Sequence, residues 1–198
     1  MPVLILASAS PRRRELLEQI GVVHRVMPVD LCEDPVPGES PEAYVERLAR
    51  EKAQAGYRAA GACAPALGSD TAVILDGEIL GKPRDEAEAI DMLMRLSGRR
   101  HRVMTAVAVA DGERCLSETV ITEVGFVTFD ESRARAYWAS GEPADKAGGY
   151  GIQGLGAVFV ESINGSYSAV VGLPLAQTST ILKKFDIEVW QSQPDPSA

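Results

Sequence analysis

The sequence predicts an α/β protein, on three observations. Residues 3–7 form a short apolar run that leads through a serine-rich turn into a helical pattern beginning at Pro11. Residues 71–75 and 78–80 are predicted to be two strands joined by Asp76-Gly77, which is a strong hairpin signal. Strand and helix patterns then continue to alternate along the chain, as they do in α/β folds.

Composition bounds the domain count and the class of partner. With 198 residues, 45% of them hydrophobic, the chain is long enough for a real core. We expect one domain over residues 1–190 and a disordered tail over 191–198. A net charge of −8 argues against a nucleic-acid groove or an anionic membrane surface, because both need a basic excess. No apolar run approaches the ~20 residues of a membrane span, and the N-terminus lacks a signal-peptide pattern.

The cysteines and histidines point to a reducing compartment and away from histidine-based chemistry. The cysteines are odd in number and share no metal-ligand spacing, so they resemble ordinary thiols. With only two histidines, the sequence offers little support for a His-based metal site or a Ser-His-Asp triad. We therefore expect a cytoplasmic protein. The residues concerned are Cys32, Cys63, Cys115, His24 and His101.

The first predicted helix begins with an unusual cluster of cations. Ser10 is placed as its N-cap and Pro11 at its first position, and three arginines follow at 12–14. Cations oppose the helix dipole at this end, and an anion on the free N–H groups would remove the conflict. The turn also carries Ser8. The alternative is that some of these arginines simply face water. We favour a phosphate site, although the pattern is not a P-loop.

An acidic, proline-containing loop over residues 30–39 follows a predicted strand at 24–29. Such loops are usually only solvated. Its carboxylates, among them Glu33, could also help hold a divalent ion, which takes oxygen ligands and often the phosphates of its substrate.

The helix that opens at Ser40-Pro41 carries a lysine on its apolar stripe. The stripe consists of Val45, Leu48, Ala49 and Lys52. Snorkelling and contact with a buried anion are equally good explanations from the pattern alone. If the anion is the substrate, the free protein holds a costly cation near its core. Replacing Lys52 by methionine should then leave the stability unchanged or raise it.

Two charged residues bracket the predicted hairpin. Asp70 lies at the start of its first strand and Lys82 just past the end of its second. These ends lie side by side in a hairpin, so an acid and an amine would meet at one end of a sheet, where α/β proteins usually bind ligands. The alternative is a surface ion pair of little consequence.

The remaining chain is predicted to form further helices at 85–98, 130–141 and 174–185, and strands at 103–110, 115–129 and 158–163. Between them, five glycines occur within residues 148–156. This segment precedes a strand and does not match the dinucleotide fingerprint. It is either a flexible connector or a place where backbone approaches a ligand.

Together these residues suit attack by water on a polyphosphate, with cations and a metal absorbing charge and an acid orienting the water. The anion-binding candidates come from three separate stretches, and two carboxylates accompany them. The set is Ser8, Ser10, Arg12, Arg13, Lys52 and Lys82, with Asp70 and Glu33.

The sequence resembles the Maf (septum formation) family from about residue 3 to residue 185. The motifs occur in order as Leu-Ala-Ser-Ala-Ser-Pro-Arg-Arg at 6–13, Gly-Ser-Asp-Thr at 68–71, Gly-Lys-Pro at 81–83, Leu-Ser-Gly at 96–98, Tyr-Gly-Ile-Gln-Gly at 150–154, Gly-Ser-Tyr at 165–167 and Val-Gly-Leu-Pro-Leu at 171–175. The resemblance implies a nucleoside triphosphate pyrophosphatase that uses a divalent metal, Mg²⁺ or Mn²⁺. It also implies a homodimer and an elongated fold like the inosine triphosphate pyrophosphatases, with a central twisted mixed sheet, flanking helices and a cleft between two lobes.

The resemblance also implies roles for individual residues. Asp70 matches the general base, and Glu33 and Asp70 match metal-site carboxylates. The phosphate-binding positions are Ser8, Arg13, Lys52 and Lys82. The positions that separate dTTP/UTP enzymes from those preferring 7-methyl-GTP are Arg12, Thr71 and Gln153, and their combination here resembles the dTTP/UTP type. Two alternatives remain: a non-catalytic nucleotide-binding regulator of cell division, and a phosphatase acting on phosphate monoesters.

Overall fold

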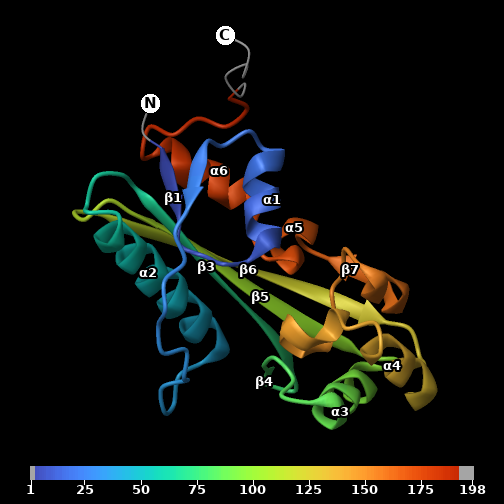
Figure 1. Cartoon of the computed structure of the whole chain (residues 1–198). Helices are drawn as coiled ribbons and strands as arrows, with labels where there is room; N and C mark the ends of the chain where they lie inside the picture. The colour runs from blue at the N-terminus through green and yellow to red at the C-terminus, as the bar shows by residue number, and fades with distance from the viewer. Residues whose placement is uncertain (1–2, 192–198) are drawn as a thin grey trace. The chain divides into compact units, whose positions relative to one another are not determined.

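The computed structural model describes residues 3–191 and shows a mixed β-sheet flanked by helices (Figure 1). The strands are β1 (Leu4–Leu6), β2 (His24–Val26), β3 (Ala66–Leu75), β4 (Glu78–Leu80), β5 (Arg100–Ala110), β6 (Cys115–Phe126) and β7 (Val160–Asn164). The α-helices are α1 (Pro11–Gln19), α2 (Pro41–Ala59), α3 (Glu86–Leu96), α4 (Glu131–Trp138), α5 (Tyr167–Val171) and α6 (Leu175–Lys183). Three 3₁₀-helices complete the set: η1 (Glu142–Asp145), η2 (Ala147–Gly149) and η3 (Leu155–Phe159).

The strand order is β2-β1-β3-β5-β6-β7, and β4 pairs with β3. β1 is parallel to both β2 and β3, whereas β4 is antiparallel to β3 and β7 is antiparallel to β6. Crossover helices explain the parallel pairs and the tight hairpin explains the antiparallel β4. The predicted α/β class with a mixed central sheet is confirmed.

The described chain forms two compact units. The first unit contains residues 3–70, 105–119 and 172–191, and the second contains residues 71–104 and 120–171. Within the described residues, no helix combines the length and the apolar character that a bilayer span requires.

In the first unit, α2 packs against β3 at very short range. A Cβ on Gly68 of β3 would lie 2.3 Å from the carbonyl oxygen of Ala49 and 2.5 Å from the backbone nitrogen of Ala53. One turn further along the helix, a Cβ on Gly56 would lie 2.6 Å from Cβ of Ala7. Only glycine permits this approach. As a result, the helix side chain at position 52 lies over the strand beside residue 70.

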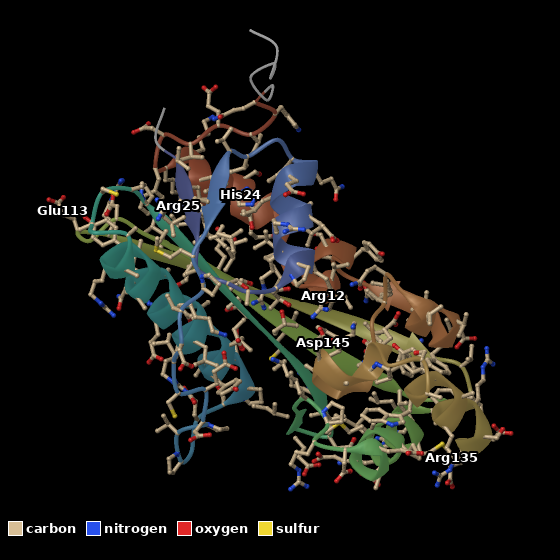
Figure 2. The ribbon with its side chains drawn as sticks, in the orientation of Figure 1. Arg12, His24, Arg25, Glu113, Arg135 and Asp145 are labelled. Carbon is tan, nitrogen blue, oxygen red and sulfur yellow. The ribbon has the colours of Figure 1, made fainter. Side chains whose placement is uncertain are left out.

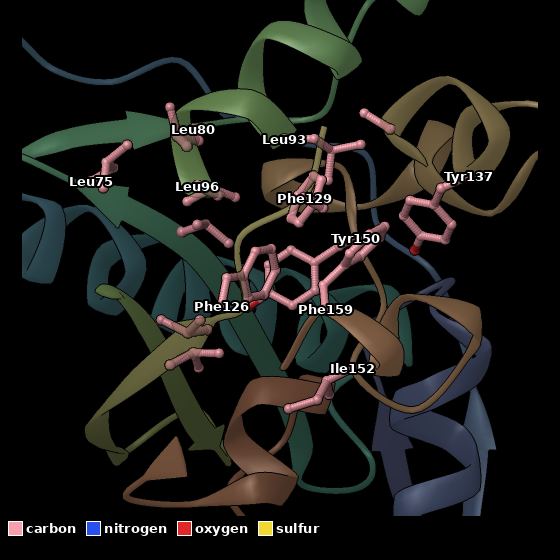
Figure 3. Packing of buried hydrophobic residues seen from close by; sticks show 14 of the residues in the cluster. Leu75, Leu80, Leu93, Leu96, Phe126, Phe129, Tyr137, Tyr150, Ile152 and Phe159 are labelled. Atoms are coloured by element: carbon pink, nitrogen blue, oxygen red, sulfur yellow. The ribbon is translucent and has the colours of Figure 1, made fainter. Parts of the chain in front are cut away.

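In the second unit, aromatic rings form the centre of the core (Figure 3). Phe129 and Phe159 have ring centroids 4.3 Å apart, and Phe126 meets Tyr150 edge-on at 4.7 Å. His101 is buried among these rings, with its ring 4.9 Å from Phe126 and its Nε2 2.7 Å from the hydroxyl oxygen of Tyr150. Leucines of β3, β4 and α3 close the cluster.

Several local predictions are wrong. The strand predicted at 24–29 ends at Val26, the strand predicted from residue 71 begins at Ala66, so that Asp70 lies inside it, and the strand predicted from residue 103 begins at Arg100. The strand predicted from residue 158 begins at Val160, because the preceding residues form η3, and the strand predicted to reach residue 129 ends at Phe126. Part of the turn predicted at 164–167 opens α5. Of the predicted tail, residues 192–198 lie outside the described residues. Gln191 is described, and its backbone N–H donates to the carbonyl of Gly21 at 3.0 Å.

Candidate functional site

Asp70 occupies a buried position in the middle of β3, where it is 7% exposed. The preceding residue fixes the strand from its other face, since side chains alternate along a strand. Ser69 is fully buried, with its hydroxyl 2.8 Å from the carbonyl oxygen of Ala106 and 3.0 Å from that of Gly172. The direction of the Asp70 side chain is therefore set by a strand that is anchored on both neighbouring segments of the first unit.

The ammonium of Lys52 joins two carboxylates. Its Nζ lies 2.7 Å from Oδ1 of Asp70 and 2.6 Å from Oε1 of Glu33. The side chains of Lys52 and Asp70 are each only 10% exposed, whereas that of Glu33 is 48% exposed. A buried ion pair of this kind is strongly destabilised by removal of one partner, by about 3–5 kcal/mol. The expectation that Lys52 is a costly cation in the free protein is wrong, because the chain itself supplies its counter-ions.

The acidic loop that carries Glu33 is tied to α2. Arg47 donates from Nε and Nη2 to the two carboxylate oxygens of Glu39 at 2.7 and 2.9 Å, and from Nη2 to the carbonyl of Asp34 at 3.2 Å. Tyr44 donates its hydroxyl to the carbonyl of Glu33 at 2.9 Å. The hydrogen bonds from Arg47 lower the pKa of Glu39 to about 2. The loop is therefore held to α2 at the backbone of Glu33 and Asp34 and at the side chain of Glu39.

Arg13 and Ser8 form a second polar group at the start of α1. Arg13 donates from Nε to the carbonyl of Gly172 at 2.9 Å and from Nη1 to Oγ of Ser8 at 3.3 Å. The backbone N–H of Ser10 also donates to Oγ of Ser8, at 3.2 Å. Ser10 holds the N-cap position, but its hydroxyl makes no capping hydrogen bond to the helix. Burial lowers the pKa of Arg13 below its ordinary value, and the charge of Asp70 opposes that shift.

Electrostatics make Asp70 a stronger base than an ordinary aspartate. Burial raises its pKa, and the positive charges of Lys52 and Arg13 oppose this effect without cancelling it. A carboxylate in this setting is held in position by a cation yet has a raised pKa, which makes it a better proton acceptor than an ordinary aspartate.

The sequence-predicted residues divide between the two units. The first unit brings together Ser8, Arg13, Glu33, Lys52 and Asp70, and Arg12 lies in the first turn of its helix α1 (Figure 2). The remaining predicted residues, Thr71, Lys82 and Gln153, belong to the second unit.

In the second unit, Thr71 continues β3 directly after Asp70. β4 pairs with β3 so that Leu80 faces Val73, and Lys82 lies two residues beyond the end of β4. Lys82 is exposed, and the carboxylate of Asp70 is paired with Lys52 instead. Gln153 is exposed in the turn between η2 and η3. The functional roles of these three residues stay predictions.

The two carboxylates fit a divalent metal as ligands. Within the described residues there is no group of three or more His, Cys, Asp or Glu side chains that could hold an ion by themselves. Glu33 and Asp70 nevertheless converge on a single atom, Nζ of Lys52, and both offer oxygen. Mg²⁺ is usually bound in this way, by one or two carboxylates together with waters and substrate phosphates. The donor set therefore suits Mg²⁺ or Mn²⁺ carried with a polyphosphate.

Sequence reasoning missed Arg47, Glu39 and Tyr44. They lie on α2 and the acidic loop, where their residue types are unremarkable for an exposed helix and its connection. Arg47 and Glu51 are four residues apart on one helix face, and this spacing predicts their ion pair. It does not predict the contact of Arg47 with Glu39.

Comparison with known proteins places the chain in a family. The family model described as Maf-like protein matches residues 3–185. A dTTP/UTP pyrophosphatase of Saccharophagus degradans is 55% identical over 192 residues, which cover 96% of this chain and 91% of that protein. Proteins of the same name from Shigella sonnei and Pectobacterium atrosepticum are each 54% identical, covering 94% and 93% of this chain and 94% of each relative.

Two solved structures resemble part of the chain. They are a nucleoside-triphosphatase / dITP/XTP pyrophosphatase of Mycobacterium abscessus (TM-score 0.41, 16% identity, 64% of this chain and 75% of that one) and the Ham1 protein of Staphylococcus aureus (TM-score 0.39, 15% identity, 62% and 71%). Family membership rests on the sequence matches, which span nearly the whole chain. The chain belongs to the Maf family.

Proposed function

We propose that this protein is a nucleoside triphosphate pyrophosphatase that hydrolyses dTTP and UTP to the monophosphate and pyrophosphate. The observation that carries the proposal is the buried Asp70–Lys52 pair with Glu33 at its solvent-facing side, in a chain more than half identical to dTTP/UTP pyrophosphatases. Burying an ion pair only for stability is unfavourable, because the free energy of desolvating both charges can exceed the gain from their attraction. A site that must bind phosphate and activate water needs both charges.

Asp70 is the general base of the proposed reaction. Lys52 occupies its Oδ1, which leaves Oδ2 to accept a proton from the attacking water. Burial raises the pKa of Asp70, which strengthens it as a base, and the charges of Lys52 and Arg13 oppose that shift. A positioned base of this kind contributes roughly 10²–10⁴-fold to the rate.

Cations and N–H groups of the first unit bind the triphosphate. Lys52 and Arg13 are held rigidly, Arg13 through Gly172 and Ser8, so little side-chain entropy is lost when an anion arrives. Lys82 is proposed to add a further positive charge. A Mg²⁺ or Mn²⁺ ion held by Glu33 and Asp70 would supply charge neutralisation on the phosphate oxygens.

Base selection is assigned to Arg12, Thr71 and Gln153. The primary amide of Gln153 offers a donor and an acceptor, which matches the O4/N3–H edge of thymine and uracil. A site built on such hydrogen bonds rejects a base that leaves them unpaired far more strongly than one that lacks a methyl group. We therefore expect dTTP and UTP to be hydrolysed at comparable rates and purine triphosphates poorly.

The cellular setting and assembly belong to the same proposal. Cys32, Cys63 and Cys115 are free thiols, which supports a reducing cytoplasm. A homodimer is proposed from the resemblance, and light scattering after gel filtration measures it directly.

A panel of triphosphates tests the proposal. The purified protein is given dTTP, UTP, CTP, GTP and 7-methyl-GTP with Mg²⁺ or Mn²⁺, and kcat/KM is measured for each. We expect dTTP and UTP to lead the panel. Faster hydrolysis of 7-methyl-GTP would overturn the dTTP/UTP assignment, and binding of nucleotides without turnover would favour the regulator instead.

A further inference from the structure

The carboxylate of Glu142, in the second unit, accepts three hydrogen bonds. Its Oε1 accepts from the hydroxyl of Tyr137 at 2.6 Å and from the backbone N–H of Gly156 at 3.0 Å, and its Oε2 accepts from the N–H of Leu155 at 2.8 Å. Leu155 and Gly156 are the first residues of η3, whose N–H groups have no partner within the helix. Glu142 therefore caps η3 from thirteen residues away in the sequence.

Tyr137 extends this contact to the other side of Gln153. Its hydroxyl donates to Glu142 and accepts from the backbone N–H of Gly151 at 3.0 Å. Burial and the hydrogen bond to Glu142 raise the pKa of Tyr137, so the hydroxyl stays protonated and available as a donor. The backbone is thus fixed two residues before Gln153 and again two and three residues after it.

Glu142 is kept ionised in this arrangement. Burial alone would raise its pKa, but the hydrogen bonds from Tyr137, Gly156 and Leu155 lower it below the ordinary glutamate value. Charge-assisted hydrogen bonds are stronger than neutral ones, so the carboxylate holds the turn more firmly than an amide would.

The glycines of the turn are explained by these contacts. A Cβ on Gly154 would lie 2.2 Å from Oε2 of Glu142, and a Cβ on Gly156 would lie 2.6 Å from the Tyr137 hydroxyl oxygen. The φ of Gly154 is −110°, which lies outside the left-handed region that favours glycine. A side chain at this position would instead displace the carboxylate of Glu142, which three hydrogen bonds hold in place.

We infer that Glu142, together with Tyr137, is a positioning residue for base recognition: it holds the turn so that Gln153 presents its amide in one orientation. The inference rests on the proposed function, because it takes Gln153 as a residue that reads the base. Ile152 is buried in the aromatic core beside Gln153, whereas Gln153 itself is exposed. The hydrogen bonds of Glu142 and Tyr137, which we call the clamp, fix the backbone on both sides of Gln153, and the core fixes Ile152. The side chain of Gln153 remains exposed.

Selectivity is the measurement that separates positioning from a merely structural role. We would compare Glu142→Gln and Tyr137→Phe with the wild type, using Glu131→Gln as the matched control, because Glu131 is an exposed carboxylate of the same unit paired with Arg135. In Glu142→Gln, the amide nitrogen must face at least one donor, so a hydrogen bond is lost while the shape is kept. Tyr137→Phe keeps the buried ring.

We expect the ratio of kcat/KM for dTTP to that for GTP to fall by about tenfold or more in both variants, because small misplacement of a recognising group is costly. The fall should come mainly from dTTP and UTP. Amide hydrogen exchange at Leu155 and Gly156 should speed up in Glu142→Gln and stay unchanged in Glu131→Gln. An unchanged selectivity ratio in both variants overturns the inference, whatever happens to stability.

Two further comparisons make the outcome decisive. Gly154→Ala should lower selectivity in the wild type, yet add little in a Glu142→Ala background where the obstructing carboxylate is gone. If Gly154→Ala lowers the selectivity ratio equally in the wild-type and Glu142→Ala backgrounds, the role given to Glu142 is contradicted. Gln153→Ala separates base recognition by Gln153 from its positioning by Glu142. If Gln153→Ala alters the selectivity ratio and the Glu142 variants do not, only the positioning role fails. If Gln153→Ala leaves the ratio unchanged, base reading by Gln153 fails, and the inference fails with it.

Discussion

Nζ of Lys52 lies 2.7 Å from Oδ1 of Asp70, and both side chains are almost completely removed from solvent. The contact exists because Gly68, two residues before Asp70, lets α2 approach β3 within the space of a missing Cβ. The proposed general base and the proposed phosphate-binding cation are therefore in contact before any substrate arrives. Changing Lys52 is expected to affect both the stability of the fold and the chemistry of the site, whereas changing Asp70 is expected to affect mainly the chemistry, because Lys52 keeps Glu33 as a counter-ion.

Lys52→Met should destabilise the protein and abolish turnover. Loss of the ammonium leaves Asp70 buried without its partner, which costs about 3 kcal/mol, at the low end of the range for buried pairs because the carboxyl can protonate. Urea unfolding measures this, with Lys183→Met on the exposed surface of α6 as the control. Adding Asp70→Asn to Lys52→Met should recover most of the lost stability. A Lys52→Met protein as stable as the wild type would show that the ion pair contributes nothing.

Asp70→Asn should lose activity without a matching loss of stability. Lys52 keeps Glu33 as a counter-ion at 2.6 Å, and an amide is easier to bury than a carboxylate. Turnover of dTTP should drop by roughly 10²–10⁴-fold while nucleotide binding persists. Asp186→Asn is a suitable control, because Asp186 has φ 56° and asparagine tolerates that conformation. Near wild-type turnover in Asp70→Asn would pass the role of base to Glu33.

The link between Arg47 and Glu39 should control how well Glu33 takes part in the reaction. Glu39→Gln removes the charge from the pair that ties the acidic loop to α2. We expect a higher KM for the metal–nucleotide complex and a smaller change in kcat, since the chemistry of Asp70 is untouched. Glu18→Gln, which affects an exposed pair with Arg14, serves as the control. If Glu39→Gln and Glu18→Gln have the same KM and kcat, the acidic loop has no part in binding the metal–nucleotide complex.

His101 should make the protein sensitive to acid. Burial lowers its pKa from 6.5 to about 4, so the folded state holds the neutral ring. The unfolded state binds the proton more readily, and stability is therefore lost as the pH falls from about 6.5 towards 4. The loss attributable to this residue approaches about 3 kcal/mol. Urea unfolding at several pH values measures it.

His101→Gln should flatten the dependence of unfolding free energy on pH in that window, whatever its effect at pH 7. An equally steep loss of stability in His101→Gln would place the acid sensitivity elsewhere in the chain.

The predictable parts of the structure are those set by neighbouring residues. The β3–β4 hairpin follows from Asp76 and Gly77, which adopt φ values of 53° and 85° as a tight turn requires. The place of Lys52 on the apolar stripe of α2 could also be predicted, because helical periodicity depends only on residues close together in the chain. The partners of Lys52 could not be predicted, since the close approach at Gly68 joins residues far apart in the chain. From pattern alone, snorkelling and anion binding were equally good explanations for Lys52, and neither anticipated two carboxylates.

The errors have a similar origin. The apolar residues around Val158 and Phe159 favour a strand by local pattern, yet η3 forms there because Glu142 accepts the N–H groups at its start. The Arg47–Glu39 contact also joins a helix to a loop and leaves no periodic signal. The resemblance to the Maf family supplied the candidate residues that periodicity could not, and in the structure Lys52 contacts two of them, Glu33 and Asp70, while Arg13 contacts Ser8.

The products formed from dTTP test the central claim most directly. Wild-type protein is incubated with dTTP and Mg²⁺, and the nucleotide products, pyrophosphate and inorganic phosphate are quantified separately, with Asp70→Asn run in parallel. The account predicts dTMP and pyrophosphate in equal amounts, with essentially no free phosphate and very little product from Asp70→Asn. Release of phosphate with dTDP, or the same product yield from Asp70→Asn, would contradict it.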